Sequence, residues 1–173
     1  GGHIIVTPPK ESTFDPAENI IAGNTLLYGA TAGEVYINGR VGERFGVRNS
    51  GATAVVEGVG NHCCEYMTGG RVVVLGPTGQ NFAAGMCGGI AYVWNPNNDF
   101  DFNCNMELIE LSLIDNDADN NELQRYIRRH LQLTGSPLAK RLLDTWEQSV
   151  NQFIKVMPIE YKRIMASINN SAE

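Results

Sequence analysis

Glycines at nearly regular intervals are the feature that most constrains the fold of this chain. All but one of its 19 glycines lie at or before Gly89. In this part, four short segments rich in β-branched residues each open on glycine and close on glycine or asparagine: 33–39, 51–58, 70–76 and 89–95. Their closing positions are 19, 18 and 19 residues apart. Apolar residues alternate within each segment, so strand-like pieces recur with a period of about 19 residues.

This period selects one kind of repeat architecture. Helical solenoids and propeller blades need repeats of more than about 30 residues. One coil of a parallel β-helix fits about 19 residues, and each coil buries its apolar residues only by stacking on its neighbours. The sequence therefore predicts an all-β parallel β-helix over residues 1–114, followed by a helical tail. Gly23 lies one period before Gly42 and indicates an earlier, less regular coil.

Glycines are expected to form the turns of each coil, because they accept positive φ and close backbone approach. A dinucleotide site would need them to open a helix, and a P-loop would need Gly-Lys-Ser/Thr after Gly79, which is absent. In one coil Asn61 is expected to replace a turn glycine, since asparagine tolerates left-handed backbone. The predicted structural turn glycines are Gly33, Gly39, Gly42, Gly46, Gly51, Gly58, Gly70, Gly76, Gly79 and Gly89.

The composition changes at Asp115, and residues 115–173 are predicted to be an acidic loop followed by two to three α-helices. Asn121 is expected to cap the first helix and Gly135 to end it. Ser136 and Pro137 then begin a second helix, with an apolar stripe of Leu138, Leu142, Trp146, Val150, Phe153 and Ile154. A third, weaker helix is predicted over 159–168. The tail and the β-helix are predicted to form one structural domain, with helices shielding the open ends of the stack.

No catalytic, cofactor-binding or metal-binding residue is predicted. His3, His62 and His130 lack metal-site spacing, and adjacent Cys63 and Cys64 lack the C-x-x-C spacing of zinc or iron–sulfur ligands. A carboxylate pair across a coil, Glu57 with Glu65, would suit a sugar-cleaving enzyme. Glu57 directly precedes a turn glycine, however, and is interpreted as a solvent-facing charge.

Charge and hydropathy indicate no nucleic-acid or membrane partner. The 13 basic and 19 acidic residues give a net charge of −6, without a run of Lys or Arg. The longest aliphatic run, 72–75, is far too short to cross a membrane. The four cysteines are expected to be free thiols of a reducing, cytoplasmic compartment. The first residues show neither a signal peptide nor an initiator methionine, which indicates a piece of a longer chain.

Several runs carry a resemblance to a known family. They are GRVGERFGVRNSG at 39–51, VVEG at 55–58, CEYMTGG at 64–70, NFAAGM at 81–86, FIKVMP at 153–158 and YKR at 161–163. Over nearly the whole chain, the sequence resembles the C-terminal (alpha subunit, Gly-repeat) domain of the glutamate synthase large subunit. The tail is more similar to the pyridine-nucleotide-dependent form of that family.

The resemblance implies a right-handed, single-stranded parallel β-helix with a non-catalytic, architectural role. It implies a parent enzyme that hydrolyses glutamine, passes the ammonia through a tunnel and reductively aminates 2-oxoglutarate to glutamate. FMN and an iron–sulfur cluster would lie in other domains of the parent. The expected partners are its amidotransferase and synthase domains and a small electron-donating subunit. The alternatives are a β-helix subunit of another redox complex, such as formylmethanofuran dehydrogenase, and a carbohydrate-active β-helix enzyme.

Overall fold

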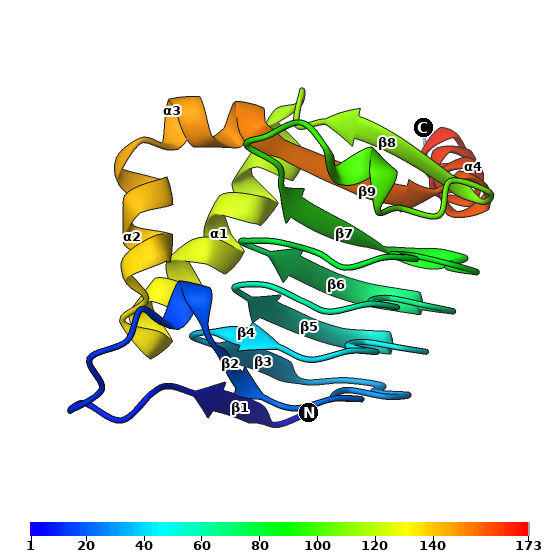
Figure 1. Cartoon of the computed structure of the whole chain (residues 1–173). Coiled ribbons are helices and arrows are strands. Elements are labelled where there is room, and N and C mark those ends of the chain that lie inside the picture. The colour runs from blue at the N-terminus through cyan, green and yellow to red at the C-terminus, as the bar shows by residue number, and fades with distance from the viewer. Residues whose placement is uncertain (173) are drawn as a thin grey trace.

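A computed structural model describes residues 1–172 of the chain, and it shows a stack of coils flanked by helices (Figure 1). The main sheet contains five parallel strands in the order β1, β3, β5, β6 and β7, followed by antiparallel β9 and β8. Their bounds are β1 His3–Val6, β3 Glu34–Ile37, β5 Ser50–Val56, β6 Thr68–Val74, β7 Gly88–Trp94, β8 Ile109–Leu113 and β9 Phe153–Pro158. A second, two-stranded parallel sheet pairs β2 (Ile20–Ala22) with β4 (Arg40–Val41).

The strand register confirms the predicted β-helix of about 19 residues per coil. Val35 pairs with Ala54, Ala54 with Val72, and Val72 with Ala91, each in parallel. These are the residues that the repeat places at equivalent positions, so each coil sets its apolar side chains directly over those of the coil before it. The less regular coil predicted around Gly23 is also present, because β1 pairs with β3 and β2 with β4.

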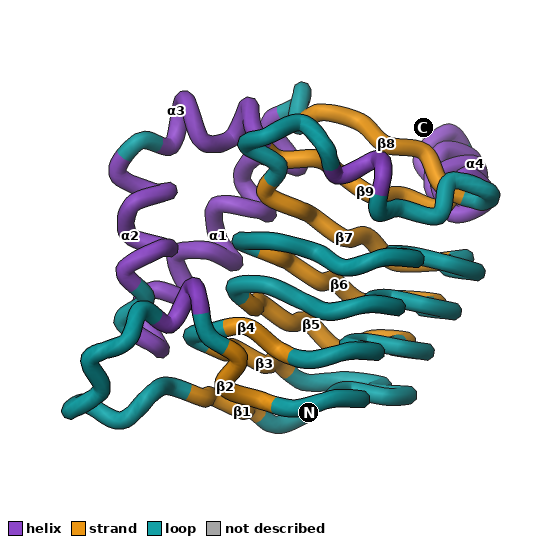
Figure 2. Tube along the Cα trace, in the orientation of Figure 1, coloured by secondary structure: helices purple, strands orange, loops and turns teal. Residues whose placement is uncertain are grey.

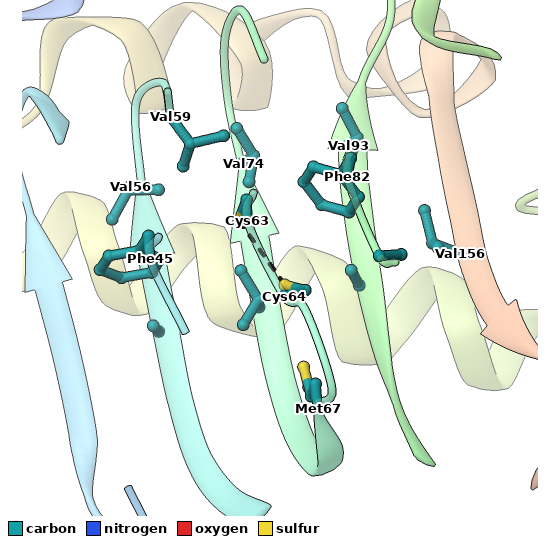
Figure 3. Close-up of a cluster of buried hydrophobic side chains, with 14 of the residues drawn as sticks. Phe45, Val56, Val59, Cys63, Cys64, Met67, Val74, Phe82, Val93 and Val156 are labelled. Atoms are coloured by element: carbon teal, nitrogen blue, oxygen red, sulfur yellow. Dashed lines mark hydrogen bonds between the residues drawn. The ribbon is translucent and has the colours of Figure 1, made fainter. Parts of the chain in front are cut away.

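The interior of the β-helix is an apolar core filled from all sides of the coils. Figure 3 shows Phe45, Cys63 and Phe82 from the turns facing Val56 and Val74 from the strands. The aromatic rings of Phe82 and Phe100 pack edge to face, with centroids 5.0 Å apart. Every coil contributes side chains to this core and covers the apolar side chains of the coils next to it. The stack is therefore stable only as a whole.

A second core lies between the outer face of the sheet and the helices. The outward side chains Tyr36, Val55, Val73 and Tyr92 pack against helix residues that include Leu123. The helices are α1 Asp117–Thr134, α2 Pro137–Asp144, α3 Trp146–Ser149 and α4 Ile159–Asn170, with 3₁₀ turns at Pro16–Glu18, Phe100–Phe102 and Val150–Gln152. The prediction that helices shield the ends of the stack is therefore wrong for α1 and α2. The sheet is apolar on both faces, so its outer face needs the cover.

Two details of the predicted tail are also wrong. The first helix is capped by Asn116 rather than Asn121, because the Asn116 side chain accepts a hydrogen bond of 2.9 Å from the Asp119 amide. The second helix ends at Asp144, and Phe153 and Ile154 belong to β9 instead. The open edge of β7 takes up β9 as a strand, which overrides the helical pattern of the local sequence. Gly135, the Ser136 cap and a last helix over 159–170 agree with expectation.

The turns on the side away from α1 and α2 stack in a regular ladder (Figure 2). In each of four coils, three residues at alternate positions have positive φ, and most are not glycine: Thr25, Leu27, Gly29, Arg44, Gly46, Arg48, His62, Cys64, Tyr66, Asn81, Ala83 and Gly85. Backbone hydrogen bonds join the coils here, such as Cys64 N–H to Phe45 O and Ala83 N–H to Cys63 O, both 2.9 Å. These bonds hold residues other than glycine in a left-handed backbone conformation, which such residues rarely adopt. The expectation that Asn61 takes a left-handed conformation is wrong; His62 takes it.

Candidate functional site

The predicted turn glycines lie in two structural settings. Six have positive φ: Gly33, Gly39, Gly46, Gly58, Gly70 and Gly89. The other four, Gly42, Gly51, Gly76 and Gly79, have ordinary φ, but a Cβ atom there would overlap atoms of the preceding coil. At Gly51 and Gly76 those atoms are backbone carbonyl oxygens, of Thr31 and Glu57. Coils stacked at roughly 4.8 Å leave no room for the extra carbon.

A buried polar cluster joins the helices to the β-helix. Glu57, which directly follows β5, has no solvent exposure, and neither do Ser136 and His130. The Ser136 hydroxyl donates a hydrogen bond of 2.5 Å to Glu57 Oε1 and accepts one of 3.0 Å from the Ala139 amide. His130 Nε2 lies 3.9 Å from the same carboxylate oxygen. One serine thus caps α2 and ties it to the sheet.

The interpretation of Glu57 as a solvent-facing charge is therefore wrong. Its only sequence signal was a position before a glycine, whereas its partner Ser136 is 79 residues away. The three residue types are those of a hydrolase triad, but the serine donates to the carboxylate instead of to the imidazole. All three are closed off from solvent, so no substrate reaches them. The cluster has a structural role, which is to connect α2 to the sheet.

A second polar cluster links α1 to strands β6, β7 and β9 beside a groove of about 590 Å³. Arg71 Nε lies 3.1 Å from both carboxylate oxygens of Glu122. The Tyr92 hydroxyl donates to Glu122 at 2.6 Å, and Lys155 Nζ donates to Asp119 at 2.7 Å. The charged groups in this cluster face partners of opposite charge, so the arrangement favours fixing α1 on the sheet over binding a ligand.

The cluster shifts the pKa values of its members. Burial, followed by the hydrogen bond to Glu122, raises the pKa of the Tyr92 phenol. Burial acts to lower the pKa of Arg71, but the charge of Glu122 and the hydrogen bonds to Glu122 and Tyr161 together outweigh it, and the net shift is upward. Burial acts to raise the pKa of Asp119, but the hydrogen bonds from Lys155, Asn116 and Tyr92 and the charge of Lys155 together outweigh it, and the net shift is downward.

The lowered pKa of Asp119 gives an expected acid sensitivity. A carboxyl group whose pKa is lower in the folded chain than in the unfolded chain, where it is about 3.9, stabilises the fold above that pH. The stabilisation is lost as the pH falls through the folded value. Urea unfolding at pH 7 and pH 3 checks this: the wild-type chain should lose more stability on acidification than Asp119→Asn. Equal losses in both chains would contradict the assignment.

Three of the four thiols are enclosed in the core of the β-helix. Cys63 and Cys64 lie side by side with their Sγ atoms 3.6 Å apart (Figure 3), and Cys104 is also buried. Burial, followed by the contact with Cys64, raises the pKa of Cys63 well above its usual value. Burial, with the nearby Cys64 and Asp101, raises that of Cys104 to about 12. Cys63 and Cys104 are therefore protonated at neutral pH, and burial keeps all three thiols away from reagents in solution.

Thiol titration checks this burial. Only Cys87 is exposed, so we expect a disulfide reagent such as DTNB to label one thiol per chain in the native state and all four after denaturation. Cys87→Ser should abolish the native reaction. Fast reaction of a second thiol in the folded chain would contradict the burial of the cysteines in the core.

The remaining candidate groups do not converge. His62 Nδ1 lies 2.6 Å from Glu65 Oε1, and Glu57 is sealed under α2, so the two carboxylates of the carbohydrate hypothesis serve different partners. Within residues 1–172, no three His, Cys, Asp or Glu side chains are placed to hold a metal ion. Over the same residues, none of the helices is long and apolar enough to span a membrane.

Comparison with known proteins identifies the family to which the chain belongs. The family model described as the GXGXG motif matches residues 1–159, and the chain belongs to this family. The matched residues include the glycine-rich coils, whose strands pair in register every 19 residues or so.

The similar curated proteins are glutamate synthases, which confirms the resemblance predicted from the sequence. The chain is 52% identical over 165 residues to the NADH glutamate synthase of Schizosaccharomyces pombe, covering 95% of this chain and 8% of that protein. It is 51% identical over 169 residues to the NADPH glutamate synthase large chain of Bacillus subtilis (97% and 11%). It is 48% identical over 158 residues to ferredoxin-dependent glutamate synthase 2 of Synechocystis (91% and 10%). The chain therefore spans about a tenth of the length of these relatives.

Proposed function

We propose that this chain is a non-catalytic scaffold domain of a glutamate synthase, holding the amidotransferase and the FMN- and iron–sulfur-bearing synthase domains in position. Glutamine, 2-oxoglutarate and a reductant would be converted to glutamate by those other domains. The ten turn glycines would be its key residues, because they set the spacing of the coils. Its buried thiols favour a reducing compartment, in keeping with a cytoplasmic parent enzyme. A small electron-donating subunit would be a further partner of the parent.

The observation that carries this proposal is that the buried polar groups serve to connect parts of the fold. Glu57 and Ser136 join α2 to the sheet, and Arg71 with Glu122 joins α1 to it. An active site instead leaves reactive groups facing a cavity where a substrate binds. Two cores on the two faces of one sheet make the domain stiff, which suits it to holding neighbours at a fixed distance.

The cysteines present do not fit an iron–sulfur cluster. An iron–sulfur cluster needs several cysteine thiolates in one place. Here Cys63 and Cys104 have raised pKa values in an apolar core, and Cys87 is exposed. We therefore assign the cluster to another domain of the parent, where the family resemblance also places the flavin.

The test is made in a full-length glutamate synthase that contains this domain. The combined variant His3→Gln, His62→Gln, Cys87→Ser removes the solvent-reaching groups best suited to proton transfer or nucleophilic attack. We expect its glutamine-dependent glutamate formation to stay within about twofold of wild type, whereas loss of a general acid or base costs about 100-fold or more. A loss of that size, with an unchanged thermal unfolding temperature, would refute the scaffold role.

A further inference from the structure

The face of α1 that points away from the sheet carries a stripe of basic and amide side chains. On the opposite face, Leu123 and Ile127 are buried against the sheet. The outer residues follow one another at intervals of three and four, so their side chains lie along one side of the helix. They line an open groove of about 350 Å³ and are called the basic stripe below: Asn121, Gln124, Arg125, Arg128, Arg129 and Gln132.

The two exposed arginines of the basic stripe have no acidic partner within residues 1–172. Neither Arg125 nor Arg128 forms an ion pair with a carboxylate of this part of the chain. Arg129 lies 3.5 Å from Glu34, but His3 contacts the same carboxylate at 3.0 Å. The stripe therefore presents positive charge that the domain itself does not neutralise.

This arrangement of charges weakens α1. On α2 and α4, Lys140 and Arg163 pair with acidic residues of their own helix, at 2.7 and 2.6 Å. On α1, the positions three and four residues after Arg125 hold two further arginines, and like charges at this spacing destabilise a helix. The whole chain is acidic, with a net charge of −6, so a cluster of cations on one face is local. A cost to stability at an exposed site indicates that these charges serve a partner.

The chemistry and the length of the basic stripe favour carboxylates carried by a protein segment. The planar guanidinium group of arginine matches a carboxylate with two parallel hydrogen bonds. From position 121 to position 132 the stripe extends about 16 Å along the helix axis, which suits several successive carboxylates better than one small anion. A nucleic acid is disfavoured, because the net charge of the domain would repel its phosphates.

The polar character of the basic stripe favours a partner that binds reversibly. Among residues 1–172, none of the large apolar side chains that are exposed belongs to α1. Permanent interfaces are more hydrophobic, whereas the interfaces of partners that bind and dissociate are about as polar as the rest of the surface. A separate protein is therefore favoured over a permanent contact within one polypeptide.

We propose that the basic stripe of α1 is a docking surface for an acidic segment of a separate protein, whose carboxylates pair with Arg125 and Arg128. Attraction between the opposite charges speeds the encounter, and salt weakens it. The contacts that fix α1 to the sheet, through Glu122 and Asp119, remain intact when the partner binds. This inference goes beyond the proposed scaffold function and does not depend on it.

Peptide binding to a full-length glutamate synthase that contains this domain tests the proposal. The probe is a fluorescein-labelled helical peptide with glutamate at every third and fourth position, and the same peptide with glutamine is its control. We expect fluorescence anisotropy to show saturable binding of the glutamate peptide, weakened about tenfold or more in the variant Arg125→Gln, Arg128→Gln. Raising NaCl from about 50 to about 300 mM should weaken it as well. No saturable binding to the wild type, equal affinity for the glutamine peptide, or no effect of salt would overturn the proposal.

Lys162→Gln, Arg163→Gln is the matched control variant, because it removes two positive charges from exposed side chains of α4. Its affinity for the glutamate peptide should stay within about twofold of wild type. Equal losses in the two double variants would show that the peptide responds to net charge alone, which refutes a site on α1. The variant Arg125→Gln, Arg128→Gln should also keep its glutamate-forming activity within about twofold. Loss of activity together with affinity would assign these arginines to the fold, and tighter binding of a single-stranded oligonucleotide would point to nucleic acid; either result contradicts the proposal.

Discussion

Replacing Gly79 by alanine is expected to destabilise the fold by about 3 kcal/mol, at the upper end of the cost of overpacking a core. The new Cβ would lie 2.5 Å from the Asn61 nitrogen and 2.5 Å from the Gly60 carbonyl carbon, both backbone atoms of the preceding coil. Backbone that is itself hydrogen-bonded to further coils yields little, so the stack must separate locally. Urea unfolding followed by circular dichroism measures the effect.

Gly23→Ala is the matched control. Gly23 occupies the equivalent position three coils earlier, and its φ is not positive. No atom lies within 4 Å of the Cβ that alanine would add there, because no described coil precedes the first one. We expect a change within about 0.5 kcal/mol, as at an ordinary surface site. Similar losses at both positions would show that backbone conformation, and not coil spacing, explains these glycines.

Glu57→Ala is expected to destabilise the chain by about 3 kcal/mol, because it leaves a buried hydroxyl without its hydrogen-bond acceptor and opens a cavity beside it. The substitution removes the acceptor of the Ser136 hydroxyl and leaves His130 beside a cavity. Thermal or urea unfolding of the purified chain measures the loss.

Glu57→Gln and Glu107→Ala serve as controls. The glutamine keeps an acceptor oxygen for Ser136, so its cost should be about 1 kcal/mol. Glu107 is exposed, and its removal should cost less than about 0.5 kcal/mol. In a double-mutant cycle with Ser136→Ala, the two losses should be clearly non-additive. Additive losses would contradict the proposal that the hydrogen bond between Ser136 and Glu57 connects α2 to the sheet.

The sequence was sufficient to predict the β-helix because its signal is a short repeat. Val35, Ala54, Val72 and Ala91 recur at equivalent positions, and the strands pair in that register. The left-handed ladder was not predictable in the same way. Cys64 and Ala83 adopt positive φ only because hydrogen bonds from adjacent coils hold them there, and neither residue type signals that conformation.

The two buried polar clusters that connect the helices to the sheet could not be predicted from the sequence either. Glu57 and Ser136 are 79 residues apart, and Arg71 and Glu122 are 51 apart. Their meeting depends on where α1 and α2 lie on the sheet. The helices were expected at the ends of the stack, away from Glu57. The local sequence of Glu57 therefore gave no indication of a buried partner on a helix. The same applies to β9, which forms because β7 offers a free edge.

The claim that this domain is a scaffold is tested most directly by the coupling between glutamine hydrolysis and 2-oxoglutarate conversion. In a full-length glutamate synthase carrying Glu57→Ala and assayed below its unfolding temperature, we would measure 2-oxoglutarate converted per glutamine hydrolysed, together with bound flavin. A scaffold that keeps the two catalytic domains in register predicts a lower ratio at unchanged flavin content. Loss of flavin, or equal loss of both half-reactions at an unchanged ratio, would contradict the scaffold role.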